Sequence, residues 1–362
     1  MTEFNIPVSV LGDGGWGTTL AILLSRKGLK VTLWGAFRDY ILYLNKKRIN
    51  SKFLPGIKIP KEIAITHNLE EAILEKQLII LAVPSQYMRK VLKRIKQFHY
   101  PREAIYLSVA KGIEMGSLQR MSEIIHAELG NIKLAVLTGP TIAQEAARGI
   151  PTTCVIGSYH KKIRKYLQGI FMTERFRVYT NEDVIGVELG GSLKNIIAIA
   201  CGISDGLGFG TNTKAALLSR GLVEISRLGY AMGAKIRTFS GISGLGDLVT
   251  TCISPYSRNR FVGEQIGRGK SIKQIESHMQ MPASPAGGPA SPAGGSASPA
   301  GGPAGRQAGV AEGIPTTKSA YALSLKYHVD MPITREVYLV LYKNKSPEKA
   351  VKDLMTRKKK EE

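Results

Sequence analysis

The chain has 362 residues, 43% of them hydrophobic and 22% charged, which is an ordinary composition for a globular protein long enough to form two domains. No apolar run reaches the ~18–20 residues of a membrane span, and the N-terminus lacks a basic segment followed by an apolar signal core. These features predict a cytoplasmic protein with no integral membrane segment. The three cysteines and six histidines lack ligand spacing, which argues against a disulfide framework and predicts no metal site.

The net charge of +22 is the unusual feature of the composition. Such a charge suits nucleic acid, an anionic membrane surface or small anionic ligands, and it also suits a merely solvated basic surface. The basic residues are spread along the chain, and the tight runs occur at 46–48, 161–162 and 357–360. Because the sequence has no aromatic-rich stacking platform, we expect no nucleic-acid partner. A basic nucleic-acid-binding protein is the non-enzymatic alternative.

The first half of the chain alternates strand-like and helix-like segments. PVSVLG (7–12) reads as a buried strand, 18–28 as a helix and KVTLW (30–34) as a second strand. Further short apolar strands are predicted at 78–84, 104–110 and 133–139. This alternation predicts an α/β, Rossmann-like, doubly wound parallel sheet, in which ligands bind at the carboxyl ends of the strands.

The second half of the chain has the pattern of an all-helical domain. Residues Leu218, Leu222 and Ile225 follow helical spacing, and Ser346 precedes a proline as the N-cap of a late helix. We therefore expect a Rossmann-like, dinucleotide-binding domain at 1–188 and an all-helical domain at 189–362. Residues 282–309 repeat the pattern PASPAGG without a bulky apolar side chain, which predicts a disordered insertion.

A glycine-rich segment lies where the first strand passes into the first helix. Gly12, Gly14 and Gly17 fit G-x-G-x-x-G, in which the glycines allow a tight turn, close approach of the pyrophosphate and close helix–strand packing. In isolation the pattern would equally suit a plain glycine turn, but its place in a strand–loop–helix–strand unit predicts dinucleotide binding. Asp13 would repel a pyrophosphate, so we expect its side chain to point away into local backbone hydrogen bonds.

The end of the second strand indicates which dinucleotide is bound. Sites for NAD usually carry an acidic residue there, and sites for NADP carry an arginine for the 2′-phosphate. The sequence continues through Gly35 to Arg38, and Asp39 follows only afterwards. A hydrogen bond from Arg38 to phosphate would contribute roughly 1.5–3 kcal/mol, which favours NADPH over NADH as the cofactor. The alternative is that Arg38 faces water.

Several polar residues interrupt segments that otherwise indicate packed structure. Lys111 ends a strand, Lys194 lies in a helical segment, Asp247 lies in GLGDL, and the run 257–259 reads SRN. A single lysine of this kind is normally a solvated surface residue.

Taken together, these motifs carry a family resemblance over essentially the whole chain. The segments are GDGGWGTTLA, VPSQ, AKGIE, GPTIAQE, GVELGGSLKNIIAIACGISDGLGFG, GLGDLVTTC, SRNR, VAEG and MPIT. The chain resembles bacterial NAD(P)-dependent glycerol-3-phosphate dehydrogenases. The resemblance implies NAD(P)H-dependent reduction of a small phosphorylated substrate, dihydroxyacetone phosphate, to sn-glycerol 3-phosphate, feeding glycerophospholipid synthesis. It also implies a homodimer, with residues 189–362 as the substrate and dimerisation domain. The chain departs from the family at Asp13, where alanine is usual, and at 282–309, which has no counterpart.

The resemblance also implies roles for individual residues. Catalysis would involve Lys194 as the proton-transfer residue, with Lys111 and Asp247. Substrate would contact Lys111, Gly139, Thr141, Lys194, Asp247, Ser257, Arg258 and Asn259. The motif and the second strand end already assign Gly12, Gly14, Gly17 and Arg38 to the cofactor site. To these the resemblance adds Gly15, Trp16, Lys111, Ala143, Arg258, Val310 and Glu312.

The chemistry of the reaction suits these residue types. When hydride reaches the C2 carbonyl, the developing alkoxide needs positive charge and a proton. A lysine with the ordinary pKa of about 10.4 is a weak acid at neutral pH, and desolvation beside a second cation, Lys111, would lower its pKa to ~8. Asp247 would orient the ammonium of Lys194, and Arg258 would hold the phosphate. Related hydroxyacid or sugar-acid dehydrogenases and a non-catalytic cofactor-binding regulator are the alternatives.

Overall fold

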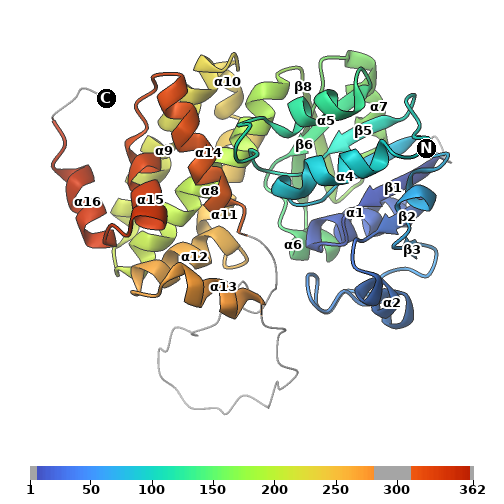
Figure 1. The fold of residues 1–362 in the computed structure, drawn as a ribbon, viewed down its shortest axis with the longest axis horizontal. Coiled ribbons are helices and arrows are strands. Elements are labelled where there is room, and N and C mark those ends of the chain that lie inside the picture. The colour runs from blue at the N-terminus through green and yellow to red at the C-terminus, as the bar shows by residue number, and fades with distance from the viewer. Residues whose placement is uncertain (1–5, 281–310, 359–362) are drawn as a thin grey trace, which may run out of the picture.

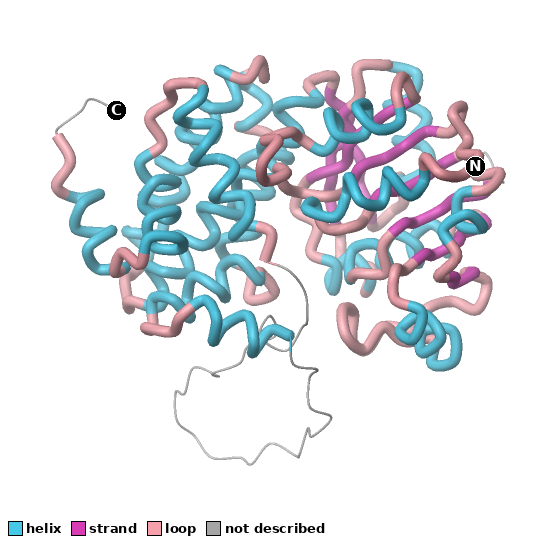
Figure 2. The backbone as a smooth tube through the Cα atoms, in the orientation of Figure 1, coloured by secondary structure: helices cyan, strands magenta, loops and turns pink. Residues whose placement is uncertain are grey.

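A computed structural model describes residues 6–280 and 311–358. The N-terminal part is built on an eight-stranded sheet with the order β3-β2-β1-β4-β5-β6-β7-β8, and the C-terminal part is helical (Figures 1 and 2). The order of the first six strands is that of dinucleotide-binding sheets, and these strands run parallel. The predicted doubly wound α/β fold is therefore confirmed. The insertion predicted at 282–309 lies outside the described residues.

The strands predicted from the sequence are all present, and the sheet contains three further strands, β3, β7 and β8. The strands are β1 (Pro7–Leu11), β2 (Lys30–Trp34), β3 (Ala64–Thr66), β4 (Leu78–Leu81), β5 (Ile105–Ser108), β6 (Lys133–Thr138), β7 (Thr152–Gly157) and β8 (Phe176–Asn181). The helices are α1 (Gly15–Arg26), α2 (Arg38–Lys47), α3 (Leu69–Ile73), α4 (Met88–Ile95), α5 (Met121–Leu129), α6 (Ala143–Ala147) and α7 (Lys161–Phe171), with a 3-10 turn η1 (Ser85–Tyr87).

One pairing differs from the all-parallel arrangement expected from the sequence. Strand β7 runs antiparallel to β6, with Val136 opposite Gly157, and β8 then pairs parallel to β7. The segment between β6 and β7 contains only the five-residue helix α6. This helix stays at the carboxyl edge, where the carbonyl of Ala143 accepts a hydrogen bond from Thr19 of α1. The chain therefore re-enters the sheet from the edge at which it left.

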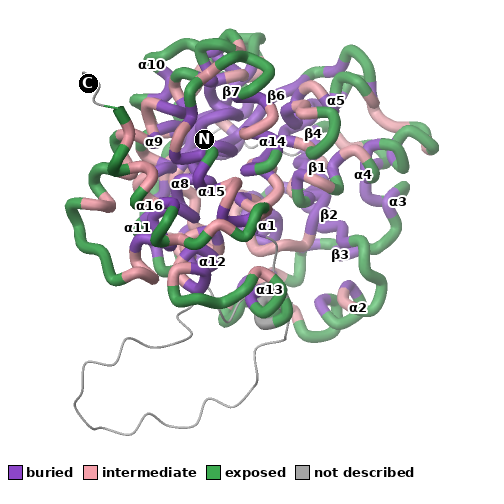
Figure 3. The backbone as a smooth tube through the Cα atoms, turned by 60° about the vertical axis from the view of Figure 1, so that its left-hand side comes forward, coloured by how far each residue is buried: buried purple, intermediate pink, exposed green. Residues whose placement is uncertain are grey.

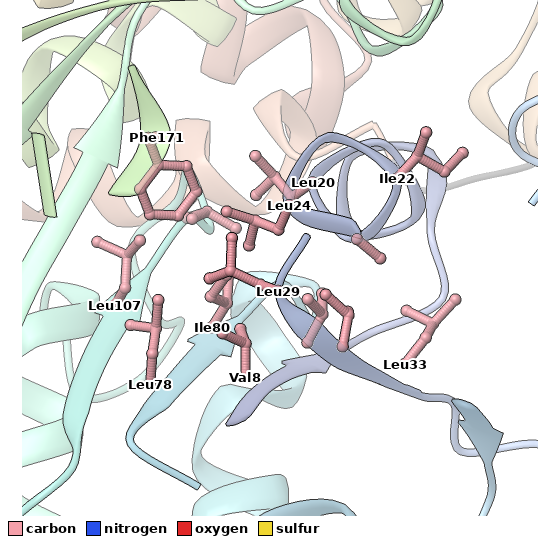
Figure 4. Packing of buried hydrophobic residues seen from close by; sticks show 14 of the residues in the cluster. Val8, Leu20, Ile22, Leu24, Leu29, Leu33, Leu78, Ile80, Leu107 and Phe171 are labelled. Carbon is pink, nitrogen blue, oxygen red and sulfur yellow. The ribbon is translucent and has the colours of Figure 1, made fainter. Parts of the chain in front are cut away.

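The core of the sheet domain explains why its central strands are continuous apolar runs. Strands β4 and β5 are buried along their whole length, as expected when helices cover both faces of a parallel sheet. In Figure 4, Leu20 and Leu24 of α1 lie over Val8, Ile80 and Leu107, and all five side chains are fully buried. This packing fixes the start of α1 above the carboxyl end of β1.

The helical part surrounds one long buried helix. Its elements are α8 (Val184–Gly206), α9 (Thr211–Ala231), α10 (Ile236–Phe239), a π-helical turn η2 (Ile242–Gly246), α11 (Asp247–Ile253), α12 (Arg258–Gly267), α13 (Ile272–Gln280), α14 (Gly313–Lys326), α15 (Pro332–Lys343) and α16 (Pro347–Met355). By length and hydropathy α8 could cross a membrane, but 94% of its apolar window is buried within the protein. Figure 3 shows this helix among the buried backbone segments. Its place is that of a core helix.

Two glycines bring α12 into direct backbone contact with α8. A β-carbon at Gly202 of α8 would lie 2.0 Å from the carbonyl oxygen of Arg260, and one at Gly263 of α12 would lie 2.0 Å from that of Ile199. No larger residue fits at either position. The close approach holds the start of α12 beside the middle of α8, where Lys194 lies.

Two helical predictions can be compared directly with the structure. Ser346 is the N-cap of α16, and its hydroxyl accepts a hydrogen bond from the backbone N–H of Lys349 at 3.3 Å, as predicted. On α9, Ile225 is buried in the helical core, and Leu218 and Leu222 pack against it while partly exposed.

Candidate active site

Two lysines and one aspartate form a cluster between the sheet and the helical part. The Nζ atom of Lys194 donates hydrogen bonds to Oδ1 of Asp247 and, at 2.6 Å, to Oγ1 of Thr251. The Nζ atom of Lys111 donates to Oδ2 of the same aspartate at 2.7 Å. One carboxylate thus binds two ammonium groups through its two oxygens, and the cluster carries a net positive charge when both lysines are protonated.

Three different parts of the chain supply these side chains. Lys111 follows β5 at the carboxyl edge of the sheet, Lys194 lies in the middle of α8, and Asp247 is the first residue of α11. The π-helical turn η2 brings α11 onto α8, where a β-carbon at Gly190 would lie 2.5 Å from the carbonyl oxygen of Ser243. The sequence GLG at 244–246 therefore shapes this turn and does not follow a strand as a phosphate loop would.

The two lysines differ in how many N–H groups they have already used. An ammonium group has three N–H donors. Lys111 donates to Asp247, to the carbonyl of Gly139 at 2.8 Å and to Oγ1 of Thr141 at 3.2 Å. Among residues 6–280 and 311–358, Lys194 donates to two acceptors, Asp247 and Thr251. Within these ranges Lys194 therefore retains one N–H for another molecule, whereas Lys111 retains none.

Burial changes the acidity of Lys194. The residue is 5% exposed, and loss of hydration lowers its pKa from 10.5 to about 7. The charge of Asp247 opposes this shift, and the charge of Lys111 adds to it. A lysine with a pKa near neutrality can both release and accept a proton at the pH of a cell.

The start of α12 contributes a second group of polar residues. Ser257 is the N-cap, and its hydroxyl accepts a hydrogen bond from the N–H of Arg260 at 3.2 Å. The Nδ2 atom of Asn259 donates to Oδ1 of Asn195 of α8 at 2.9 Å. Arg258 lies between them, and burial lowers the pKa of its guanidinium while the charge of Glu312 raises it. A helix N-terminus and an arginine together favour an anion.

Glu312 links the helical part to the sheet. Its carboxylate accepts hydrogen bonds from the hydroxyl of Ser85 and, at 2.9 Å, from the backbone N–H of Ser85, the first residue of η1 after β4. Burial raises the pKa of Glu312, and Arg258 and the Ser85 bonds oppose this shift. Val310, the other residue expected from this segment, lies outside the described residues.

The glycine loop after β1 has the shape that a pyrophosphate requires. Gly12 has a φ of +129°, and a β-carbon there would lie 2.6 Å from the carbonyl of Ala82. At Gly17 a β-carbon would lie 2.0 Å from the carbonyl oxygen of Gly12, whereas at Gly14 no described atom would lie within 4 Å. No side chain caps the N-terminus of α1, and its first turn contains no acidic residue. The residues present therefore fit a dinucleotide phosphate, which would face Gly14.

The remaining residues expected at the cofactor site lie around this loop. Gly15 and Ala143 are neighbours, because a β-carbon at Gly15 would lie 3.7 Å from that of Ala143. The ring of Trp16 packs toward that of Phe176, with 6.4 Å between the two ring centroids. Arg38 begins α2 and is exposed. Apart from Val310 and the exposed Arg38, the expected residues thus fall into two groups, one around the glycine loop and one around Lys194.

Two residues of the site were not found by sequence reasoning. The side chain of Asn50 donates to the carbonyl of Asp13 and to Oγ1 of Thr18, both at 2.8 Å, and so fixes the glycine loop. Nothing in the sequence around Asn50 indicates this contact. Thr251, the second acceptor of Lys194, lies one helical turn after Asp247, and that i, i+4 spacing could have identified it.

Comparison with known families and proteins agrees with this geometry. The family model described as NAD-dependent glycerol-3-phosphate dehydrogenase matches with its N-terminal part at residues 7–164 and its C-terminal part at residues 183–290 and 300–352. The glycerol-3-phosphate dehydrogenase [NAD(P)+] of Thermoanaerobacter sp. (strain X514) is 45% identical over 355 residues, covering 98% of each chain. That of Citrifermentans bemidjiense is 45% identical over 353 residues, covering 97% of each chain.

Comparison with solved structures indicates the same family. The crystal structure of glycerol-3-phosphate dehydrogenase from Coxiella burnetii superposes with a TM-score of 0.87 at 35% identity, covering 98% of this chain and 99% of that one. A ketopantoate reductase from Ralstonia eutropha, 13% identical with a TM-score of 0.57 over 96% of this chain and 100% of that one, shares the fold alone. The chain belongs to the NAD-dependent glycerol-3-phosphate dehydrogenase family.

Proposed function

We propose that this protein reduces dihydroxyacetone phosphate with NAD(P)H and one proton, giving sn-glycerol 3-phosphate and NAD(P)+. The observation that carries the proposal is the cluster of Lys194, Asp247 and Lys111 beside the anion-binding start of α12. The 45% identity to glycerol-3-phosphate dehydrogenases [NAD(P)+] along almost the whole chain supports the same reaction. When bound, the reduced nicotinamide supplies the hydride that is added to C2 of the substrate.

Lys194 is the residue to which we assign the proton. Its third N–H, which has no acceptor among the described residues, would bond the substrate carbonyl oxygen, and this proton passes to the oxygen as the C2–O double bond is reduced. A pKa of about 7 supports the role, because the ammonium is then charged in a useful fraction and acidic enough to donate. Solvent then returns a proton to the neutral amine for the next turnover.

Lys111 and Asp247 act on Lys194 and on the charge of the carbonyl. The three N–H groups of Lys111 have protein acceptors, so it contributes a fixed positive charge near the developing alkoxide. Asp247 holds the ammonium of Lys194 in one orientation and keeps both lysines at the carboxyl edge of the sheet. Gly139 and Thr141 position Lys111 in turn.

The substrate phosphate is assigned to the start of α12. Arg258 supplies a guanidinium, and the first backbone N–H groups after Ser257 have no intrahelical acceptor. Asn259 is held by Asn195, which keeps the start of the helix rigid. Binding the phosphate here positions C2, several bonds away, near Lys194, so that binding energy contributes to orientation at the reacting carbon.

We extend the proposal to the assembly and setting of the enzyme. Partly exposed apolar side chains on α9, among them Leu217, Leu218 and Leu222, support a homodimer in which a second copy covers this helix. All three cysteines are free thiols, which supports a cytoplasmic location. The product is the backbone unit of glycerophospholipids, so the enzyme would supply their synthesis.

The reaction is tested by following the absorbance of NADH and of NADPH with dihydroxyacetone phosphate in parallel assays. Oxidation of the nicotinamide that depends on the phosphorylated substrate, and on the enzyme, is the expected result. Unphosphorylated dihydroxyacetone is the matched control and should react far more slowly, because it has no group for Arg258. No oxidation with dihydroxyacetone phosphate and either nicotinamide would overturn the proposal.

A further inference from the structure

The carboxylate of Asp13 lies at the carboxyl end of β2, although the residue belongs to the glycine loop after β1. The loop is tied to β2 because the N–H of Gly12 donates to the carbonyl of Trp34 at 2.9 Å. A β-carbon placed on Gly35 would lie 2.7 Å from the carboxyl carbon of Asp13 and 3.0 Å from its Oδ1. The carboxylate therefore occupies the space directly over Gly35, which the absence of a side chain leaves open.

This carboxylate retains acceptor capacity. No side chain in the described ranges donates a hydrogen bond to it, and the polar groups around it are its own backbone N–H, the charge of Lys52 and the phenol of Tyr40. Burial raises the pKa of Asp13, because the carboxylate has lost hydration without gaining a side-chain partner. The expectation of a local backbone contact is met, but the side chain also reaches the neighbouring strand end.

The place it reaches has a defined chemistry in dinucleotide-binding sheets. An acidic residue at the end of the second strand accepts hydrogen bonds from the hydroxyls of the adenosine ribose. In this chain β2 ends at Trp34 and is followed by Gly35, Ala36 and Phe37, so the strand itself supplies no acid there. Asp13 brings a carboxylate to the same place from the adjacent loop.

We propose that Asp13 is a cofactor-specificity residue, which accepts the ribose hydroxyls of NADH and disfavours the 2′-phosphate of NADPH. The proposal rests on the dinucleotide site of the proposed function and concerns which dinucleotide that site prefers. It gives the loop aspartate the role that an acid on β2 has elsewhere.

Arg38 would favour the 2′-phosphate of NADPH, which Asp13 disfavours. It begins α2 three residues after Gly35, is exposed, and makes no ion pair within the part of the chain that the structure describes. The sequence-based preference for NADPH rests on Arg38 alone. With the carboxylate of Asp13 over Gly35, the preference becomes the balance of a phosphate-binding cation and a hydroxyl-binding anion.

The balance is measured by direct binding, without turnover. Dissociation constants for NADH and NADPH are obtained from nicotinamide fluorescence for the wild type, Asp13→Ala and Asp13→Asn. We expect Asp13→Ala to weaken NADH and tighten NADPH, so that the ratio of the two constants changes about 10- to 100-fold. Asp13→Asn keeps an acceptor of the same size without the charge, and should tighten NADPH while weakening NADH less.

Two further variants make the result specific. Asp39→Ala removes the same charge from the neighbouring exposed position on α2 and should leave the ratio unchanged. Arg38→Ala should weaken NADPH alone. An unchanged ratio in folded Asp13→Ala and Asp13→Asn, with both dinucleotides bound, would overturn the specificity role and leave the proposed reaction intact. Failure of the wild type to bind either dinucleotide would overturn both.

Discussion

The Nζ atom of Lys194 donates to Oδ1 of Asp247 in an ion pair that is almost entirely shielded from water, with 5% of the lysine and 1% of the aspartate exposed. Such a pair would ordinarily keep a lysine charged far above neutral pH. Here the pKa is about 7 because burial outweighs the attraction of Asp247, whose other oxygen binds Lys111. The aspartate thus orients Lys194 while leaving it acidic.

Removing the amine of Lys194 should abolish most turnover without preventing folding. For Lys194→Ala, and for Lys194→Met, whose longer side chain fills more of the space of the lysine, we expect kcat for reduction of dihydroxyacetone phosphate to fall about 10²- to 10⁴-fold. The reason is that general acid catalysis is lost. Asp247 keeps Lys111 as a partner in both variants. Steady-state kinetics measures the loss, and thermal unfolding and NADH binding check the fold. Near-normal kcat in either folded variant would remove Lys194 from proton transfer.

The pH dependence of the two reaction directions should be opposite. Reduction requires the ammonium form of Lys194, so kcat/KM for dihydroxyacetone phosphate should fall as the pH rises through about 7. Oxidation of glycerol 3-phosphate requires the neutral amine, so its kcat/KM should rise through the same pH. Profiles should begin above pH ~6.5, where the substrate phosphate is mostly dianionic. A reduction rate that stays constant to pH ~9 would contradict the lowered pKa.

Arg258 should act on the substrate phosphate and not on the carbonyl. In Arg258→Ala we expect KM for dihydroxyacetone phosphate to rise about 10- to 100-fold, the loss of a charge-assisted hydrogen bond, with a smaller change in kcat. The slow reaction of unphosphorylated dihydroxyacetone should be unaffected. An equal loss of activity with both substrates would instead indicate a general disturbance of the site.

Arg260 offers a matched control on the same helix. Its guanidinium is bound to Asp205 at 2.7 Å and is removed from the start of α12 by two residues. Arg260→Ala deletes the same charge and should leave KM for dihydroxyacetone phosphate within about twofold, because a partly exposed ion pair contributes little.

The parts of the site that were predictable from sequence are those formed by local spacing. Gly12, Gly14 and Gly17 lie within one strand–loop–helix unit, so a short pattern was enough to predict the tight turn and the close helix–strand packing. Their role in binding a dinucleotide stays a prediction. Lys194 and Asp247 are 53 residues apart and meet only because η2 turns α11 onto α8. No spacing rule brings them together, and the pairing was anticipated through family resemblance.

Orientation and side-chain direction were harder to predict. The composition of β7 suits a buried strand, but its antiparallel pairing depends on α6 staying at one edge of the sheet. The contact of Asp13 with Gly35 likewise depends on the hydrogen bond between Gly12 and Trp34, which sets the distance from loop to strand. Both are tertiary relationships between segments whose own sequences do not encode them.

Gly14 should be replaceable for folding but not for cofactor binding. Its φ of −65° suits alanine, and a new β-carbon would have no described atom within 4 Å. That β-carbon would stand where the pyrophosphate approaches, so Gly14→Ala should keep its free energy of unfolding and weaken NADH about 10-fold or more. Gly17→Ala should lose stability, because its β-carbon would lie 2.0 Å from the carbonyl oxygen of Gly12. Denaturant titration and fluorescence binding separate the two effects, and unchanged NADH affinity in Gly14→Ala would place the phosphate elsewhere.

Glu224 of α9, which is not part of the active-site cluster, should make the free energy of unfolding depend on pH. Its buried carboxylate accepts hydrogen bonds from the backbone N–H groups of Ile333 at 2.6 Å and Thr334 at 3.0 Å, and so caps the start of α15. Burial raises the pKa of Glu224 to about 7, although these hydrogen bonds oppose the shift. The native protein therefore holds a proton at pH values where the unfolded chain, with a pKa near 4.5, has already lost it.

The sign of the effect follows from this difference in bound protons. The stabilisation is complete below the unfolded pKa and is lost as the pH rises from about 4.5 through about 7, by on the order of 3 kcal/mol in the free energy of unfolding. Glu224→Gln cannot ionise, so subtracting its urea-unfolding profile from that of the wild type should isolate the decline. Glu70→Gln, at an exposed position on α3, should match the wild type throughout. Parallel profiles for wild type and Glu224→Gln between pH 5 and 8 would show that Glu224 ionises alike in both states, and that its hydrogen bonds to α15 fully compensate for burial.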